Sequence, residues 1–302
     1  MNKFLLLSVL IIFSVSIGYF LGGQRLFEQG QRPKIQSQAV KKPILRVALV
    51  ADSHNENELL AKALSQAGGK GVNFVIGLGD YTNVGTVEEL RQAREVFDRS
   101  KLEYLVTVGD HDLWDSRNRG EDPLTNFREV FDDSTRVLER EGIQFVILDN
   151  SDIYSGIDSE SWKLLNDSLS GYIGQDGQTS ENVKCQMSNV KCAQPRLRFV
   201  FAQKTPFHPE SKHVMGKDSE EVSRQARKLI DLLEEKKVDG FFSGDLHFFA
   251  EFKSPAQIVK MTTVGAVAAE RNFQGPRFAM LTVFDDYSWE VEDIEIRMDA
   301  NR

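Results

Sequence analysis

The stretch YLVTVGDHD, residues 104–112, decides how the rest of the chain is interpreted. It begins with an apolar and partly β-branched run, Tyr104 to Val108, which has the length and composition of a buried strand. A glycine follows, and then Asp110, His111 and Asp112 stand together without a gap. Adjacent titratable groups repel one another or must be compensated, so the pattern indicates either a solvated turn or a place where positive charge is bound.

Three further strand-like runs end in the same way. Residues 44–50 lead into Ala-Asp-Ser-His, residues 74–78 lead into Gly-Asp, and the run that begins at Gly240 leads into Gly-Asp-Leu-His. In open α/β sheets, ligands bind beyond the carboxyl ends of the strands, so these ends are expected to face one crevice. The side chains that they bring there are Asp52, His54, Asp80, Asp110, His111, Asp245 and His247.

The segments between the strand-like runs have helical periodicity. Residues 57–67 carry apolar side chains on one face, and Thr86-Val87-Glu88-Glu89 has the form of a capping box at the start of another helix. Alternating strands and helices predict parallel β-α-β units in an α/β domain whose sheet becomes mixed toward the C-terminus. Further helices are expected at 159–169 and 219–236, and further strands at 144–148, 197–202, 240–249, 257–263, 278–284 and 289–296.

The first residues differ from the rest of the chain. Residues 4–23, FLLLSVLIIFSVSIGYFLGG, are uncharged and nearly all apolar, and about 20 such residues suffice to span a bilayer as a helix. We therefore expect an N-terminal transmembrane signal anchor over residues 1–23, with a cleaved signal peptide as the alternative. Residues 24–42 are polar and predict a tether, so the folded domain is expected to span residues 43–302.

The orientation of this anchor has opposing signals. Lys and Arg are more numerous after the apolar segment than before it, which favours a cytoplasmic domain, but long domains are often translocated regardless of flanking charge. Cys185 and Cys192 lie close together, and a disulfide between them would suit an exported domain, with two unrelated thiols as the alternative. The favoured interpretation is a single-pass membrane protein whose folded domain is extracytoplasmic.

The net charge of the chain and its Asp and His clusters exclude some functions and favour others. A net charge of -8 argues against general nucleic-acid binding, because an acidic surface is not attracted to phosphate backbones. Asp and His together are typical ligands of first-row divalent metals. Two metals about 3.5–4 Å apart can activate a bridging water and assist an in-line displacement at phosphorus. Each Gly-Asp or His alone has an ordinary structural explanation, so the order of the clusters carries the prediction.

These clusters resemble the pattern of the calcineurin-like metallophosphoesterases, which is D-x-H, G-D, G-N-H-D/E, a lone H and G-H-x-H. The sequence has D-S-H at 52–54, G-D at 79–80, G-D-H-D at 109–112 and G-D-L-H at 244–247, and Gln203 stands where the lone His is expected. The resemblance covers almost the whole chain after the tether. It implies a mixed β-sheet sandwich flanked by helices in αββα order.

The resemblance also implies two divalent metal ions, with Mn favoured and Fe, Zn or Mg as alternatives. The ligands of the first ion would be Asp52, His54, Asp80 and His247, and the ligands of the second would be Asp80, Asp110, Gln203 and Asp245. His111 would protonate the leaving oxygen or steady the phosphoryl charge, and Asp112 would orient His111 by a hydrogen bond. His208 is a candidate substitute for the missing His, but an ordinary loop role is favoured for both His208 and His213.

Four aspartates in place of the family's two change the expected chemistry. An all-oxygen second site suits Mn, Mg or Ca, while the added negative charge weakens Lewis acidity and repels an anionic substrate. The sequence predicts a membrane-anchored phosphoesterase that hydrolyses a phosphomonoester or phosphodiester, either a small molecule or a lipid-linked substrate, with a metal-activated hydroxide. The alternative is an inactive protein of the same fold that binds metal or phosphoryl groups.

Overall fold

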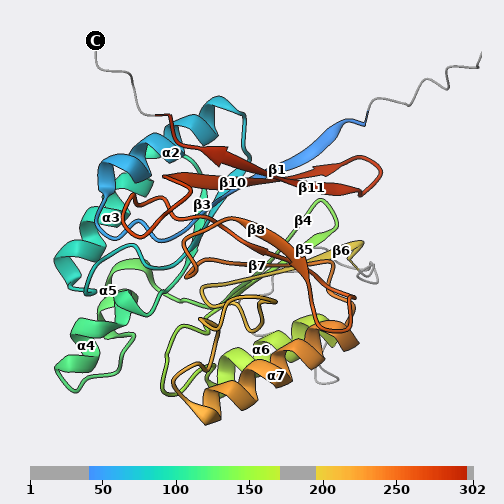
Figure 1. Cartoon of the computed structure of the whole chain (residues 1–302). Coiled ribbons are helices and arrows are strands. Elements are labelled where there is room, and N and C mark those ends of the chain that lie inside the picture. The colour runs from blue at the N-terminus through green and yellow to red at the C-terminus, as the bar shows by residue number, and fades with distance from the viewer. Residues whose placement is uncertain (1–40, 171–194, 298–302) are drawn as a thin grey trace, which may run out of the picture. The chain divides into compact units, whose positions relative to one another are not determined.

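The computed structural model describes residues 41–170 and 195–297 (Figure 1). The predicted anchor, most of the tether, and the two cysteines Cys185 and Cys192 therefore lie outside the described residues. Within these two ranges, no helix combines the length and the apolar character that a membrane span requires.

The first sheet has five strands, and it contains three of the four strand ends that lead into acidic residues in the sequence. The parallel core of this sheet is β1 (Pro43–Val50), β2 (Phe74–Leu78) and β3 (Tyr104–Thr107). Strand β10 (Arg277–Phe284) pairs antiparallel with β1, and β11 (Trp289–Glu295) completes the sheet in the order β11-β10-β1-β2-β3. The predicted parallel β-α-β units and the antiparallel C-terminal strands are thus confirmed.

A second sheet of six strands lies against the first. Its order is β4-β5-β6-β7-β9-β8, and its parallel part runs from β5 through β6 and β7 to β9. The bounds of its strands are β4 Arg136–Arg140, β5 Ile143–Leu148, β6 Leu197–Ala202, β7 Gly240–Ser243, β8 Ala250–Lys253 and β9 Lys260–Thr263. The expectation of one continuous sheet was wrong, because β4 and β5 form an antiparallel hairpin that starts a new sheet. The two-sheet arrangement implied by the family resemblance is confirmed.

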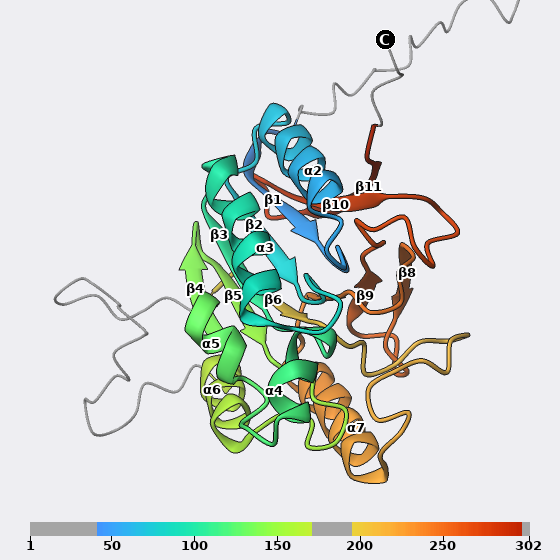
Figure 2. The same ribbon diagram turned by 90° about the vertical axis from the view of Figure 1, so that its left-hand side faces the viewer.

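The alternation of side chains along the strands produces four layers. On β1, Leu45, Val47 and Leu49 point into the cluster between the two sheets, whereas Ala48 and Val50 point outward toward helices. The outer face of the first sheet is covered by α2 (Asn57–Gly69), α3 (Val87–Ser100) and α5 (Thr125–Phe131). The outer face of the second sheet is covered by α6 (Ser159–Ser170) and α7 (Glu220–Glu235), as Figures 1 and 2 show.

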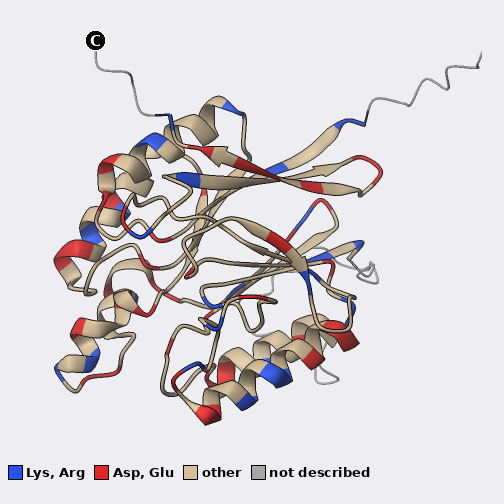
Figure 3. Cartoon of the chain, in the orientation of Figure 1, with Lys and Arg blue, Asp and Glu red and all other residues tan. Residues whose placement is uncertain are grey.

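The exposed faces of the helices carry both signs of charge. Figure 3 shows acidic and basic residues interspersed along α3 and α7, so neither helix presents a uniformly basic face.

The start of α3 has the predicted capping box, in which the Thr86 side chain and Glu89 satisfy each other's backbone N–H groups.

Some elements differ from the sequence prediction, and most of the differences lie near strand ends. The segment 240–249 was expected to be one strand, but β7 ends at Ser243 and the chain leaves the sheet before β8 begins. The short helices η1 (His111–Leu113) and α4 (Trp114–Asn118) follow β3 directly and were not predicted. The carboxyl ends of the parallel strands are therefore followed by turns and short helical segments that carry polar side chains.

Candidate metal centre

The carboxyl ends of strands from both sheets meet at one place and are cross-linked by hydrogen bonds. The Asp52 amide donates to the Gly79 carbonyl at 3.0 Å, which joins the ends of β1 and β2. The amide of Asp245, which follows β7, donates to the Asp52 carboxylate at 3.1 Å, which joins the two sheets. The predicted crevice therefore exists, and it receives side chains from β1, β2 and β3 of one sheet and from β6 and β7 of the other.

The backbone at this crevice is left-handed at five of the predicted metal ligands. The φ angles are 53° at Asp52, 42° at His54, 55° at Asp80, 65° at Asp245 and 61° at His247. Non-glycine residues rarely adopt this conformation, although Asp, Asn and His adopt it more often than others. Such strain concentrates at functional sites, where the surrounding structure holds it in place.

The glycine before Asp110 has a steric reason. A Cβ atom on Gly109 would lie 2.1 Å from the Asp80 amide nitrogen and 2.1 Å from its Oδ1 atom. Any side chain at this position would force β2 and β3 apart at their ends. The Gly-Asp pairs in the sequence therefore allow the carboxylates of neighbouring strands to approach closely.

The first cluster consists of Asp52, His54 and His247. Their possible ligand atoms lie within 4.8 Å of one another, and the two histidine Nε2 atoms are 3.3 Å apart. Two nitrogens bound tetrahedrally to one ion at about 2.0–2.1 Å would stand about 3.4 Å apart. Burial, aided by the neighbouring imidazoles, lowers the pKa of His54 to about 4, so its ring is neutral at pH 7. Neutral imidazoles beside a buried carboxylate fit a divalent cation.

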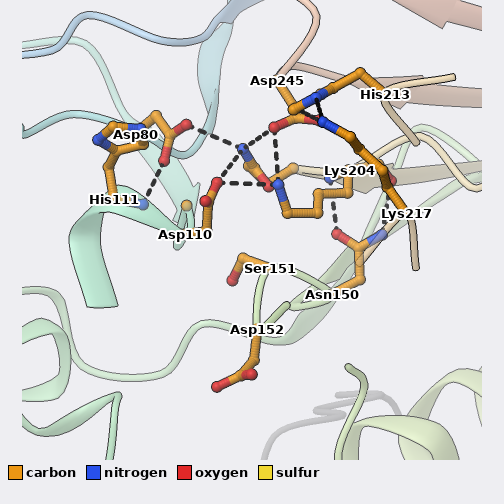
Figure 4. Close-up of polar contacts among 12 residues, drawn as sticks. Asp80, Asp110, His111, Asn150, Ser151, Asp152, Lys204, His213, Lys217 and Asp245 are labelled. Carbon is orange, nitrogen blue, oxygen red and sulfur yellow. Dashed lines mark hydrogen bonds and ion pairs between the residues drawn. The ribbon is translucent and has the colours of Figure 1, made fainter. Parts of the chain in front are cut away.

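The second cluster consists of Asp80, Asp110 and Asp245, and nitrogen atoms already face its carboxylates (Figure 4). The Lys204 Nζ atom lies 2.8 Å from Asp245 Oδ1 and 3.0 Å from Asp110 Oδ1. The Gln203 Nε2 atom lies 3.1 Å from Asp80 Oδ2 and 3.3 Å from an oxygen of each of the other two acids. Gln203 was expected to offer its amide oxygen to a metal, but that oxygen is buried and has no hydrogen-bond partner among the described residues.

The pKa values divide the acids in a different way from the two clusters, because Asp80 resembles Asp52 of the first cluster and not Asp245 of its own. Burial, with the charge of Asp245 nearby, raises the pKa of Asp52 well above its usual value. Burial, with the charge of Asp110 nearby, does the same for Asp80. Burial also acts on Asp245, but there Lys204 and then His213 outweigh it and hold the pKa below the usual range. Asp52 and Asp80 therefore lack positive charge that Asp245 already has.

The His111 ring lies beside the first cluster and is fixed in orientation. It packs edge-on against the His54 ring with centroids 4.7 Å apart and stacks on the Trp114 ring at 4.0 Å. The His111 Nδ1 atom is 2.9 Å from the Asn83 carbonyl oxygen, which can only accept, so Nδ1 carries a proton. Among the described residues no hydrogen bond reaches Nε2, which leaves that atom available to a substrate.

Asp112 does not make the expected hydrogen bond to His111. Its carboxylate accepts from the Gly109 amide at 3.0 Å and from the Thr82 amide and hydroxyl at 3.0 and 2.8 Å. Burial raises the pKa of Asp112 to about 6, although these hydrogen bonds oppose the shift. The turn of η1 points Asp112 inward, where it ties the loop after β2 to the loop after β3. The Asn83 carbonyl and Trp114 orient the His111 ring instead.

Two residues reach the second cluster without having been predicted to do so. Lys204 was not among the predicted site residues, and His213 was assigned an ordinary loop role, yet His213 Nε2 lies 3.4 Å from Asp245 Oδ2. By contrast, His208 accepts hydrogen bonds from the Glu210 and Ser211 amides and holds its own loop. The sequence feature that could have predicted the role of Lys204 is its position directly after Gln203 at a strand end.

Comparison with known proteins gives a family match and several similar folds. A sequence model of the family described as calcineurin-like phosphoesterase matches residues 45–249. No curated protein matches the sequence. The purple acid phosphatase PPD1 from yellow lupin (Lupinus luteus) seeds is similar with a TM-score of 0.54 and 12% identity, over 82% of this chain and 51% of that chain. The present chain thus spans about half the length of the lupin protein.

Two further structures have the same fold. The protein TT1561 of Thermus thermophilus is similar with a TM-score of 0.50 and 9% identity, over 84% of this chain and 99% of that one. GAP50, described as the anchor in the inner membrane complex of Plasmodium, is similar with a TM-score of 0.50 and 12% identity, over 84% of this chain and 89% of that one. At such low identities these likenesses show the fold alone.

Proposed function

We propose that this chain, which belongs to the calcineurin-like phosphoesterase family, is a metal-dependent hydrolase of phosphomonoesters or phosphodiesters. The observation that carries the proposal is the first cluster, where Asp52, His54 and His247 converge beside an oriented His111. Buried acids with raised pKa values at the edge of a strained crevice are typical of catalytic centres.

The residues of the first cluster would hold the metal. An ion bound by Asp52, His54 and His247, with Asp80 beside them, would supply Lewis acidity and an activated water. The chain's own contribution is to keep both imidazoles neutral and to fix their positions through the left-handed turns. The metal identity is proposed as Mn, with Fe, Zn or Mg as alternatives, because a set of carboxylate and imidazole ligands is typical of first-row divalent metals.

His111 would handle the proton of the leaving group. The Asn83 carbonyl keeps the Nδ1 proton in place, so the second nitrogen, Nε2, is the atom that can donate to a departing oxygen when the ring is protonated. The stacked Trp114 ring restricts rotation of the imidazole. General acid catalysis of this kind contributes about 10²–10⁴-fold to a rate.

We also propose a membrane location for this activity. The support is the uncharged segment 4–23 and the polar residues that follow it, which together would tether the domain near a membrane surface. An extracytoplasmic domain that acts on small or lipid-linked phosphoesters would fit this arrangement. Protease accessibility of the domain in intact cells tests the orientation, since a cytoplasmic domain would be protected.

The activity is tested with p-nitrophenyl phosphate and bis-p-nitrophenyl phosphate on the full-length chain in the presence of Mn²⁺. We expect turnover that falls by about 10²–10⁴-fold in His111→Ala, with Mn²⁺ binding unchanged. His208→Ala is the matched control, because that ring serves its own loop. Equal turnover in the wild type and His111→Ala would remove the proposed role of His111.

A second candidate function is supported by one specific observation. The nitrogen atoms of Lys204 and Gln203 lie at hydrogen-bond distance from the carboxylates of the second cluster. With these partners, the carboxylates do not need a second metal ion. Such a protein could bind metal or a phosphoryl group without catalysis. Bound Mn²⁺ with no turnover of either nitrophenyl compound would favour this alternative.

A further inference from the structure

We propose that the ammonium group of Lys204 takes the place of a second metal ion, so that the centre is mononuclear with a built-in cation beside it. The inference deepens the proposed function and rests on it only in requiring that the first cluster binds a metal. The carboxylates that would ligate a second ion are Asp80, Asp110 and Asp245.

The first support is the position of the ammonium group. Lys204 Nζ lies 2.8 Å from Asp245 Oδ1 and 3.0 Å from Asp110 Oδ1, at hydrogen-bond distance from both (Figure 4). An ammonium has donors only, so it cannot ligate a metal while it is protonated. An ion bound to the same two oxygens would stand within a few ångströms of the ammonium and would be repelled by it.

The second support is that Gln203 presents its donor side to the same acids. Its Nε2 atom is 3.1 Å from Asp80 Oδ2 and 3.3 Å from Asp110 Oδ1 and Asp245 Oδ1. If the Gln203 amide were turned over, its oxygen would face the three carboxylates and would be repelled by them. The hydrogen-bond donors of two neighbouring residues therefore reach one oxygen of each of the three acids without a metal.

The third support is that Lys204 is held in place by its backbone. The buried side chain of Asn150, at the end of β5, accepts from the Lys204 amide at 2.9 Å and donates to the Lys204 carbonyl at 2.7 Å. On the preceding residue, the Gly244 amide donates to the Gln203 carbonyl at 3.0 Å. Only 7% of the Lys204 side chain is exposed, so the ammonium is part of the packed centre and does not reach it from solvent.

The arrangement has a chemical consequence. An ammonium contributes positive charge and hydrogen bonds, but it has no open coordination position for a water or a substrate oxygen. Activation of the nucleophile would fall to the first cluster alone, and Lys204 would fix the carboxylates of the second. In this arrangement Asp110 and Asp245 bind the ammonium group of Lys204. The family resemblance had implied that they ligate a second metal ion.

The test is the number of Mn²⁺ ions that the full-length chain binds, measured by titration calorimetry and elemental analysis. We expect one Mn²⁺ per wild-type chain, with the six-line paramagnetic resonance signal of an isolated ion. In Lys204→Ala the pocket opens, so we expect two Mn²⁺ per chain and a spin-coupled signal. Lys204→Arg keeps the charge, and Lys217→Ala removes a lysine whose Nζ atom lies 3.5 Å from His213 Nδ1, so both controls should bind one.

The outcomes separate this inference from the proposed function. Two Mn²⁺ in the wild type or in Lys204→Arg, no Mn²⁺ in the wild type, or one Mn²⁺ in a folded Lys204→Ala would each overturn the role of Lys204. If Lys204→Ala does not fold, the wild-type count and Lys204→Arg decide. One bound Mn²⁺ without turnover would contradict the proposed hydrolase activity but not the proposed role of Lys204. Two bound Mn²⁺ with turnover would contradict the role of Lys204 but not the hydrolase activity.

Discussion

The two acid clusters lie side by side at the same strand ends, yet they are compensated by different means. In the first cluster, Asp52 stands beside two histidines, and the pKa of the His54 ring is lowered by burial and by its neighbours to about 4. In the second, Asp245 faces the ammonium of Lys204, which holds the Asp245 pKa low despite its burial. Neutral imidazoles leave the first cluster short of positive charge, whereas in the second the ammonium supplies positive charge to Asp110 and Asp245.

The backbones of the two clusters differ as well. Every member of the first cluster has a left-handed φ, and so do Asp80 and Asp245 in the second, whereas Asp110 in the second has a helical φ of -69°. Lys204 shows that the number of carboxylates at a sheet edge does not give the number of metal ions, because a neighbouring lysine can neutralise some of the carboxylates. The predictions below test whether the clusters really divide into a metal site and an ammonium site.

The largest expected effect is on metal affinity in the first cluster. Asp52→Asn removes the only carboxylate of that cluster, and we expect the Kd for Mn²⁺ to rise by more than about 100-fold, since even outer-shell changes cost 10–100-fold. Titration calorimetry measures the loss. Asp167→Asn, at an exposed position on α6, is the matched control. An unchanged Kd in Asp52→Asn would place the metal elsewhere and break the comparison.

The next effect is the pH dependence of metal binding. The pKa values of Asp52 and Asp80 are raised, so at low pH a metal must displace protons from them, and affinity should rise with pH by up to about tenfold per unit per proton released. His54 contributes only near pH 4, where its own pKa lies. Asp245, whose pKa is lowered, contributes none.

Calorimetry from about pH 5 to pH 8, in two buffers of different ionisation enthalpy, counts the protons released. We expect release of at least part of one proton at the acid end and less at the alkaline end. An affinity that does not change with pH would show that the raised pKa values of Asp52 and Asp80 play no part in metal binding.

A smaller effect is expected from the ring that supports His111. Trp114→Leu removes the aromatic stack at 4.0 Å, and aromatic pairs are worth about 0.5–1.5 kcal/mol, so kcat should fall by about 2–10-fold. Trp114→Phe keeps an aromatic ring and should recover most of the rate. Mn²⁺ affinity should stay constant in both variants, and a change in it would mean that Trp114 supports the first cluster directly.

The smallest expected effect concerns His213 in the second cluster. Its side chain is 52% exposed, so the contact with Asp245 is worth only about 0.2–1 kcal/mol after solvent screening. The hydrogen bond to Asp245, ahead of the opposing effect of burial, raises the His213 pKa. The stabilisation is therefore full below the unfolded pKa of 6.5 and is lost as pH rises through the folded value.

Thermal unfolding of His213→Ala checks this sign. We expect a small drop in Tm at about pH 6 and none at about pH 9, by the linkage of protonation to folding. The larger charge in the second cluster belongs to Lys204, so the Mn²⁺ count should not change. A drop in Tm that grows with pH would contradict the pairing of His213 with Asp245.

Much of the fold was predictable because the strands of the first sheet carry strong local signals. The run at 74–78 and the capping box at Thr86 appear in the structure as predicted. The division into two sheets was not predictable from local patterns, since it depends on which strands pair. Strand β4 and the helices after β3 are short, and short elements have weak periodicity.

The location of the site was also predictable, but its charge balance was not. Alternation along a strand would point Gln203 and Lys204 to opposite faces. Strand β6 ends at Ala202, so both residues lie beyond the strand and both reach the same acids. Asp112 was misassigned for a similar reason, because η1 turns its side chain away from His111.

The left-handed turns also limit how this centre can be redesigned. At Asp52, Asp80 and Asp245 a side chain must tolerate a positive φ, which Asn, Asp and Gly do and β-branched residues do not. His54 and His247 share this conformation, so the main chain admits Asp and His before any ion is present, and these are typical ligands of first-row divalent metals. A designer who wanted a β-branched side chain at any of these positions would have to rebuild the turn, because exchanging the side chain alone would add strain.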